Sequence, residues 1–174
     1  ADFYFQILKL NNKKVASIGT LGVKTHHNNL KINNTTLDSI SLNKHLQNIK
    51  KHKINNVILE ASSHGLKQHR LDGINFKIGI FTNLSRDHLD YHKSYKDYLN
   101  SKLLLFKNLL KKNSNVITDI NIPEYKNIKN ITKRKKLKIS TVGSINSSLE
   151  LIKHKYKDDK QVFQIKYNNK IYLL

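Results

Sequence analysis

Polar and apolar residues are spaced along much of the chain with the periodicity of amphipathic helices. In the first such segment Ala1, Phe5 and Leu8 fall on one stripe, as expected when one face of a helix packs against a core. A long polar stretch, residues 21–38, follows a short apolar run and is predicted to be a loop. The segments with helical spacing are residues 1–11, 39–53 and 95–112.

Short apolar runs bounded by polar residues lie between these helices and are typical of buried parallel strands. Strands that alternate with helices indicate an α/β fold with a mostly parallel sheet flanked by helices. After about residue 137 the pattern changes to short strands, with Asn168-Asn169 as a tight turn, so a small antiparallel β portion is expected near the C-terminus. We expect an α/β part over residues 1–112 and a remainder over residues 113–174. The predicted strands are residues 15–20, 56–61, 77–84, 115–118, 162–167 and 170–174.

Length and composition exclude several classes of protein. A chain of 174 residues with 38% hydrophobic residues is long enough for one domain with a real core. The absence of cysteine excludes disulfide-stapled modules, thiol catalysis and cysteine-based zinc sites. No apolar run approaches the roughly 18 residues that a membrane span needs, so we expect a cytoplasmic protein without membrane contact.

The net charge of +20 is carried almost entirely by lysine. There are 29 lysines and only three arginines, and the lysines are scattered except for one dense run, Lys133 to Lys138. Nucleic-acid binders more often use arginine, which makes bidentate contacts with bases and phosphates. The composition therefore favours a small-molecule partner over nucleic acid, with a basic nucleic-acid-binding domain as the alternative.

Polar clusters follow two successive predicted strands. Glu60 ends the strand at residues 56–61, and Ser62 to Arg70 follow it; Thr82 and Asn83 end the next strand. In parallel α/β sheets ligands bind at the carboxyl ends of the strands. We therefore expect both clusters to line one crevice.

Familiar catalytic patterns fit these clusters poorly. His88 and His92 are four residues apart but lack the glutamate of a zinc-protease helix, and no nucleophile elbow surrounds Ser63. A hard-cation site that uses Glu60 fits better, because Mg²⁺ typically takes few protein groups in addition to phosphates.

Lys102 lies four residues after Tyr98 on the apolar face of its predicted helix. The residue either extends its ammonium group to water along an apolar stem or serves as a functional amine. A neutral lysine amine also reacts with CO₂ to form a carbamate, whose oxygens suit Mg²⁺.

Two blocks of sequence closely resemble the Mur ligases. They are EASSHGLKQHRL, from Glu60 to Leu71, and FTNLSRDHLDYH, from Phe81 to His92, and a YxxSKxxLF segment surrounds Lys102. The opening helix, SIGTLG from Ser17 and NTT from Asn34 also fit. Within the family the chain is most similar to the central domain of the MurE type, and the resemblance implies a P-loop NTPase-like α/β fold.

The resemblance implies an ATP-dependent amide ligase of peptidoglycan precursor synthesis. ATP would phosphorylate the D-glutamyl carboxylate of UDP-N-acetylmuramoyl-L-alanyl-D-glutamate, and the amine of a diamino acid would displace phosphate from the acyl phosphate. Mg²⁺ would accompany ATP, and the protein would act in the cytoplasm as a monomer. Either meso-diaminopimelate or L-lysine fits as the diamino acid.

The resemblance also implies roles for individual residues. Glu60, His88 and a carbamylated Lys102 match metal ligands, with His88 and Lys102 also catalytic, and Asn83 lies with Arg86 in the nucleotide-site block. The matches to substrate-binding positions are Asn34, Thr35, Thr36, Ser62, Gln68 and Arg70.

The family's GTNGKT phosphate loop, its N-terminal uridine-binding domain and its C-terminal domain have no counterpart in these 174 residues. We therefore expect an internal fragment, truncated at both ends and inactive by itself. A folylpolyglutamate- or cyanophycin-synthetase relative and a non-catalytic homologue are the alternatives within the family.

Overall fold

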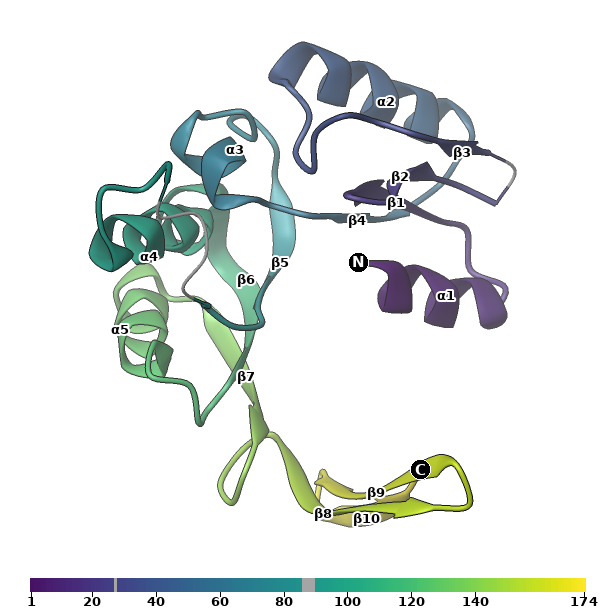
Figure 1. The fold of residues 1–174 in the computed structure, drawn as a ribbon, viewed down its shortest axis with the longest axis vertical. Coiled ribbons are helices and arrows are strands. Elements are labelled where there is room, and N and C mark those ends of the chain that lie inside the picture. The colour runs from purple at the N-terminus through teal and green to yellow at the C-terminus, as the bar shows by residue number, and fades with distance from the viewer. Residues whose placement is uncertain (27, 86–89) are drawn as a thin grey trace. The chain divides into compact units, whose positions relative to one another are not determined.

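The computed structural model describes residues 1–26, 28–85 and 90–174. The described residues form two compact units, residues 1–74 with 90–104, and residues 75–85 with 105–174. Each unit combines helices with one β-sheet (Figure 1). The α/β class predicted from the sequence is confirmed.

The first unit is built on a four-stranded sheet in the order β3-β2-β1-β4. β1 and β4 pair in parallel, with Ile18 opposite Leu59, whereas β1-β2 and β2-β3 are antiparallel. The first unit's elements are α1 (Asp2–Leu10), β1 (Val15–Gly19), β2 (Gly22–Lys24), β3 (Asn29–Leu30), α2 (Ser39–Lys51), β4 (Asn56–Leu59), α3 (Ser63–Lys67) and α4 (Tyr95–Leu104).

The second unit holds a six-stranded sheet in the order β10-β9-β8-β7-β6-β5. Strands β5 to β8 pair in parallel, and β8 to β10 form the antiparallel portion that the sequence predicts. The second unit's elements are β5 (Phe76–Phe81), the π-helical turn η1 (Leu105–Leu109), β6 (Leu110–Asp119), α5 (Tyr125–Lys135), β7 (Lys138–Gly143), β8 (Leu149–Lys157), β9 (Lys160–Tyr167) and β10 (Lys170–Leu173).

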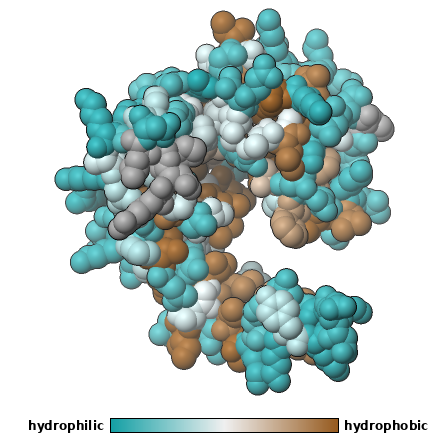
Figure 2. Space-filling view, in the orientation of Figure 1, coloured by the Kyte–Doolittle hydropathy of each residue, from teal (hydrophilic) through white to brown (hydrophobic). Residues whose placement is uncertain are grey.

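Each unit buries its own core. In the first unit β1 is buried along its whole length, and Leu42 and Ile49 of α2 are buried as well. In the second unit Phe106, Val116 and Ile128 are fully buried. Hydrophilic residues cover much of the face drawn in Figure 2, as the lysine-rich composition requires.

Two sequence predictions about elements are wrong, and one further helix is not predicted. The stretch at residues 21–38 is not all loop, because β2 and β3 form a hairpin in it. The helix predicted over residues 95–112 ends at Leu104, and the backbone passes through η1 into β6 at Leu110. Helix α5 lies in a segment for which the sequence analysis predicts no element.

No helix in the described ranges combines the length and apolar character that crossing a bilayer requires.

Candidate functional site

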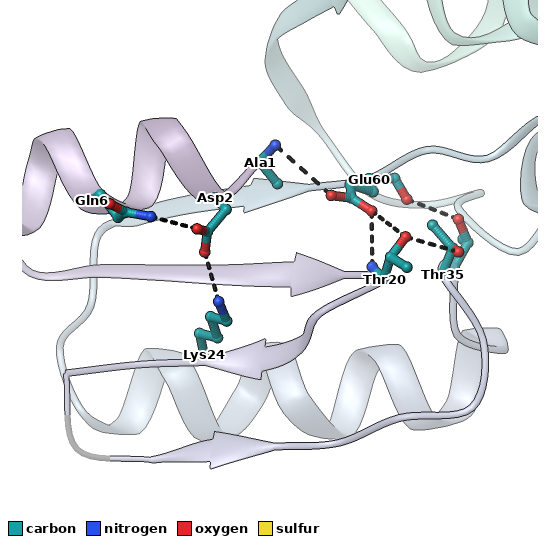
Figure 3. Close-up of polar contacts among 8 residues, drawn as sticks. Ala1, Asp2, Gln6, Thr20, Lys24, Thr35 and Glu60 are labelled. Atoms are coloured by element: carbon teal, nitrogen blue, oxygen red, sulfur yellow. Dashed lines mark hydrogen bonds and ion pairs between the residues drawn. The ribbon is translucent and has the colours of Figure 1, made fainter. Parts of the chain in front are cut away.

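Glu60 lies directly after β4, beside the end of β1. Its backbone N–H donates to the carbonyl of Ile18 at 2.9 Å, which extends the parallel pairing by one residue. The carboxylate oxygen Oε2 accepts hydrogen bonds from the backbone N–H and the hydroxyl of Thr20, both at 2.8 Å (Figure 3). The carboxylate is thus held at the carboxyl end of two parallel strands, where the sequence analysis places it.

Gly19 makes this approach possible. A Cβ at position 19 would lie 2.4 Å from Cδ of Glu60, far inside van der Waals contact. The other carboxylate oxygen, Oε1, lies 3.8 Å from the amino group of Ala1, and the Glu60 side chain is 33% exposed. The carboxylate is therefore fixed through one oxygen and still reaches solvent.

Thr35 and Thr36, on the loop that precedes α2, extend the hydrogen-bond network around Glu60. Because the Thr20 hydroxyl donates to Glu60, the hydroxyl of Thr35, 3.1 Å away, donates to Thr20. The Thr36 hydroxyl donates to the backbone carbonyl of Glu60 at 2.8 Å and accepts from the N–H of Ser62 at 2.9 Å. Buried Thr36 thus ties the loop to the end of β4.

Arg70 and Ser62 bring the SSHGL block to the same place. The Arg70 guanidinium donates from Nη1 to the carbonyl of Thr36 at 2.7 Å. The Ser62 hydroxyl caps α3 by accepting from the N–H of Gly65 at 3.1 Å. Gly65 has no room for a side chain, since a Cβ there would lie 2.5 Å from Cγ2 of Thr36.

Four of the six predicted substrate-binding residues therefore belong to one network around Glu60 and the start of α3: Thr35, Thr36, Ser62 and Arg70. Gln68 is exposed and donates to the Tyr91 hydroxyl at 3.1 Å. Asn34 is an exposed residue of the same loop as Thr35. Their contacts with a substrate stay predictions.

Lys102 is half-buried on α4, between buried Ser101 and Leu103. Its Nζ lies 5.2 Å from the centroid of the Tyr98 ring, so the ammonium group faces an aromatic surface. The placement agrees with the predicted apolar face of the helix. Carbamylation stays a prediction.

Asn83 follows β5 and is exposed in the second unit. The metal and catalytic prediction for His88 and the nucleotide-site prediction for Arg86 fall outside the described residues.

Residues that the sequence analysis did not select complete the arrangement. Thr20 anchors Glu60, and its signal is its place immediately after β1. Lys67, His92 and Asp97 form a polar cluster between α3 and α4, with Lys67 Nζ 2.6 Å from Asp97 Oδ2. This hydrogen bond to the Lys67 ammonium is the main reason that the pKa of Asp97 is lowered. No spacing pattern marks the cluster, because its members lie on two helices and the loop before α4.

The donor chemistry around Glu60 suits a hard cation. A partly exposed carboxylate surrounded by hydroxyls offers only oxygen ligands, which Mg²⁺ prefers. Within the described ranges no three histidine, aspartate or glutamate side chains converge as a metal-binding group. Glu60 is the single carboxylate of the predicted ligand set, so among the described residues the magnesium prediction rests mainly on it.

The whole chain is similar to known ligases. The family model for the Mur ligase middle domain matches residues 2–173. UDP-N-acetylmuramoyl-L-alanyl-D-glutamate–2,6-diaminopimelate ligase of Rickettsia montanensis is 38% identical over 98% of the chain, and that of Chelativorans sp. (strain BNC1) is 35% identical over 99%. The chain spans about a third of the length of these relatives, 36% in both cases.

The fold of this chain is also similar to solved structures. A structure of UDP-N-acetylmuramoyl-L-alanyl-D-glutamate–2,6-diaminopimelate ligase matches 97% of this chain and 34% of its own, with a TM-score of 0.86 and 26% identity. A mutant of L. casei FPGS shares the fold at a TM-score of 0.64 and 12% identity, over 95% of this chain and 46% of its own. Sequence and structure agree, and the chain belongs to the Mur ligase family, whose middle domain it matches along nearly its whole length.

Proposed function

We propose that this chain supplies the central domain of an ATP-dependent ligase that adds a diamino acid to UDP-N-acetylmuramoyl-L-alanyl-D-glutamate. The observation that carries the proposal is the Glu60 carboxylate, which Thr20 fixes at the ends of β1 and β4. Thr35 bonds to Thr20, Thr36 to the backbone carbonyl of Glu60, and Arg70 to the carbonyl of Thr36, so all three belong to the same network. The relatives named for this activity match nearly the whole chain.

In this role Glu60 holds the magnesium ion that neutralises phosphate charge when ATP is bound. The hydrogen bonds from Thr20 hold the carboxylate in position before any ligand binds. Catalysis of phosphoryl transfer depends on charged groups that are preorganised in this way. Thr35, Asn34, Ser62, Gln68 and Arg70 contact the muramoyl substrate, and Asn83 and His88 serve the nucleotide and its metal. A carbamylated Lys102 adds a second oxygen donor for metal. We place the enzyme in the cytoplasm as a monomer.

The test is a phosphate-release assay of the ligase polypeptide that carries these residues, with ATP, the UDP-linked dipeptide and either meso-diaminopimelate or L-lysine. We expect phosphate release only when all three substrates are present. Glu60→Gln keeps the hydrogen bonds from Thr20 but loses the charge, so activity should fall about a hundredfold or more, in the range found when one preorganised electrostatic group is removed.

One control variant and one further test variant complete the assay. Glu150→Gln changes an acidic residue of β8 in the other unit and should leave turnover unchanged. Lys102→Ala should lower activity without rescue by bicarbonate, whereas wild-type activity in that variant would exclude the carbamate. A wild-type protein that releases no phosphate with either diamino acid would overturn the proposed function.

A further inference from the structure

His92 is an imidazole buried between α3 and α4, with 1% of its surface exposed. It follows the site residues in the sequence, but nothing in the proposed chemistry uses it. A fully buried polar ring is costly unless its nitrogens are paired, so its partners indicate what it does.

The two ring nitrogens face different partners. Nε2 lies 2.9 Å from the hydroxyl of Ser63, the first residue of α3. Nδ1 lies 3.4 Å from Oδ2 of Asp97 on α4, and that same oxygen lies 2.6 Å from Nζ of Lys67. The ring therefore connects a hydroxyl on one helix to a carboxylate on the other.

These neighbours select one tautomer. A lone pair on Nδ1 would face the carboxylate of Asp97 unfavourably, so the proton belongs on Nδ1 and points to Asp97. Nε2 is then an acceptor, and the Ser63 hydroxyl donates to it. The Lys67 ammonium, which is about a third exposed, already pairs with Asp97, so that carboxylate does not need a positively charged imidazole as its counter-ion.

The contact between Nδ1 and Asp97 is longer than a good hydrogen bond, and in the described part of the chain Nδ1 has no other partner in hydrogen-bonding geometry. A small movement of α4 toward the ring would shorten this contact to a hydrogen bond between Nδ1 and Asp97. Hydrogen bonds of this kind are often long in a free enzyme and shorten in the substrate complex.

The ring packing extends the connection to the site. His92 stacks on Tyr98 with ring centroids 4.9 Å apart and a tilt of 28°. The opposite end of the same chain of contacts is Lys102, whose Nζ lies 5.2 Å from the Tyr98 centroid. The link thus runs from Ser63 through His92 and Tyr98 to Lys102.

A serine, a histidine and an aspartate in this order also resemble a hydrolase triad. Ser63 is only 3% exposed, however, so its hydroxyl is not accessible to a substrate carbonyl. The arrangement suits a structural tie between helices and not a nucleophile.

We propose that His92, as the neutral Nδ1–H tautomer, is a positioning residue that ties the helix carrying the substrate-binding SSHGL block to the helix carrying Lys102. The inference rests on the proposed function for its catalytic consequence, but the tautomer and the coupling to Ser63 are properties of the chain alone. Its function is to hold Arg70, Ser62 and Lys102 in one geometry while ligands bind.

The first experiment is long-range ¹H–¹⁵N correlation NMR of the 174-residue chain, which reports the tautomer of each histidine. We expect His92 as the Nδ1–H tautomer, and Ser63→Ala should shift the Nε2 resonance. An Nε2–H tautomer, or an Nε2 resonance that Ser63→Ala leaves in place, would overturn the inference whether or not the protein is a ligase.

The second experiment measures kinetics in the ligase polypeptide. His92→Phe keeps a ring for stacking on Tyr98 but removes both nitrogens, and we expect kcat to fall roughly tenfold to hundredfold, as for other small displacements of a site. Ser63→Ala should give a similar loss, and the double variant should be no worse than either single variant, since all three break one link.

Conservative variants separate positioning from folding. His92→Gln places an amide near the position of Nε2 and should recover part of kcat, whereas His92→Asn reaches only the position of Nδ1 and should not. His69→Asn is the matched control, because His69 pairs with Asp72 at the surface and has a positive φ that asparagine tolerates.

Full kcat in a folded Ser63→Ala protein would overturn the positioning role, and this variant serves even if His92→Phe fails to fold. An inactive wild type, by contrast, would overturn the proposed function. The NMR experiment would then still test whether His92 links α3 to α4 through Ser63.

Discussion

At the scale of single residues, the site depends on close approaches that leave no room for side chains. Gly19 lies against the Glu60 carboxylate, and Gly65 lies against Thr36. Thr36 in turn bonds to the backbone on both sides of the β4–α3 junction. A methyl group at either glycine therefore acts directly on the geometry of the candidate metal carboxylate or its support.

We expect Gly65→Ala to destabilise the chain by about 1–3 kcal/mol, the usual cost of overpacking a tight contact. The new methyl group would meet Cγ2 and Cβ of Thr36 at 2.5 and 2.7 Å, so the loop must move. Urea unfolding measures the loss. Gly73→Asn is the control, since Gly73 has open space around it and a φ of +82° that asparagine accepts better than alanine; equal stability of the two variants would contradict the packing argument.

The Lys67–Asp97 pair predicts a pH dependence. The Lys67 ammonium lowers the pKa of Asp97 below its ordinary value of 3.8, so Asp97 contributes stability that is present above that value and lost as the pH falls through the lower, folded-state pKa. Both side chains are about a third exposed, so the effect is screened by water and is small.

Asp97→Asn should therefore lower the urea midpoint at neutral pH, and the difference from wild type should shrink on going to about pH 3. Lys67→Met should act in the same direction, because it removes the main cause of the lowered pKa. A difference that stays constant between neutral and acid pH would show that the ion pair does not couple to folding.

At the scale of secondary-structure elements, the sequence predicts what local periodicity controls. β1 is a run of buried residues and α2 has a clear apolar stripe, and both are found close to the expected bounds. The apolar run after Lys102 is ambiguous between helix and strand, and the sheet of the second unit decides it by recruiting Leu110 into β6. Helix α5 escapes prediction because its buried face consists of little more than Ile128 and Thr132 among lysines.

The candidate site likewise has a part that the sequence predicts and a part that it does not. Placement of Glu60 at the carboxyl end of β4 follows from the strand pattern and the rule for parallel sheets. The partners of that carboxylate do not. Thr20 bonds to it across 40 residues of chain, and Thr35 reaches it only through the Thr20 hydroxyl, 15 residues away in sequence, so the folded backbone alone sets these distances. His92 is buried for the same kind of reason, through contacts from Ser63 and Tyr98.

The β9–β10 hairpin offers a prediction at this scale. Asn168 and Asn169 have φ values of +49° and +60°, as the tight turn predicted from the sequence requires. Asn169→Val should destabilise the hairpin by roughly 1–2 kcal/mol, the cost of a left-handed backbone for a residue with a Cβ branch. Asn169→Gly should be neutral or stabilising. Hydrogen exchange of the Phe163 amide, which bonds to the carbonyl of Leu174, reports the change, and equal exchange in both variants would contradict it.

At the scale of the whole molecule, the charge of +20 invites the alternative of nucleic-acid binding. The dense basic run lies at the end of α5, where cations stabilise a helix by interacting with its terminal carbonyls. Lys135 goes further, since its Nζ donates to the carbonyls of Lys107 and Leu110, at 2.5 and 3.0 Å. Part of the run is therefore a local brace within the second unit.

The last prediction distinguishes a nucleic-acid-binding site from a generally basic surface. A scattered positive charge should hold the chain on a DNA oligonucleotide at low salt and release it by about 0.15 M, where screening acts over about 8 Å. Changing Lys133, Arg134 and Lys136 to glutamine should then weaken binding no more than changing the exposed Lys153, Lys155 and Lys157 of β8, while Lys135→Gln should instead lower the urea midpoint. Tight binding that persists at about 0.15 M salt and is lost only with the first triple variant would favour the nucleic-acid alternative, because a dedicated site concentrates its contacts. Equal, salt-sensitive effects assign the lysines to the general surface, which leaves the Glu60 network as the part of the chain built for a specific ligand.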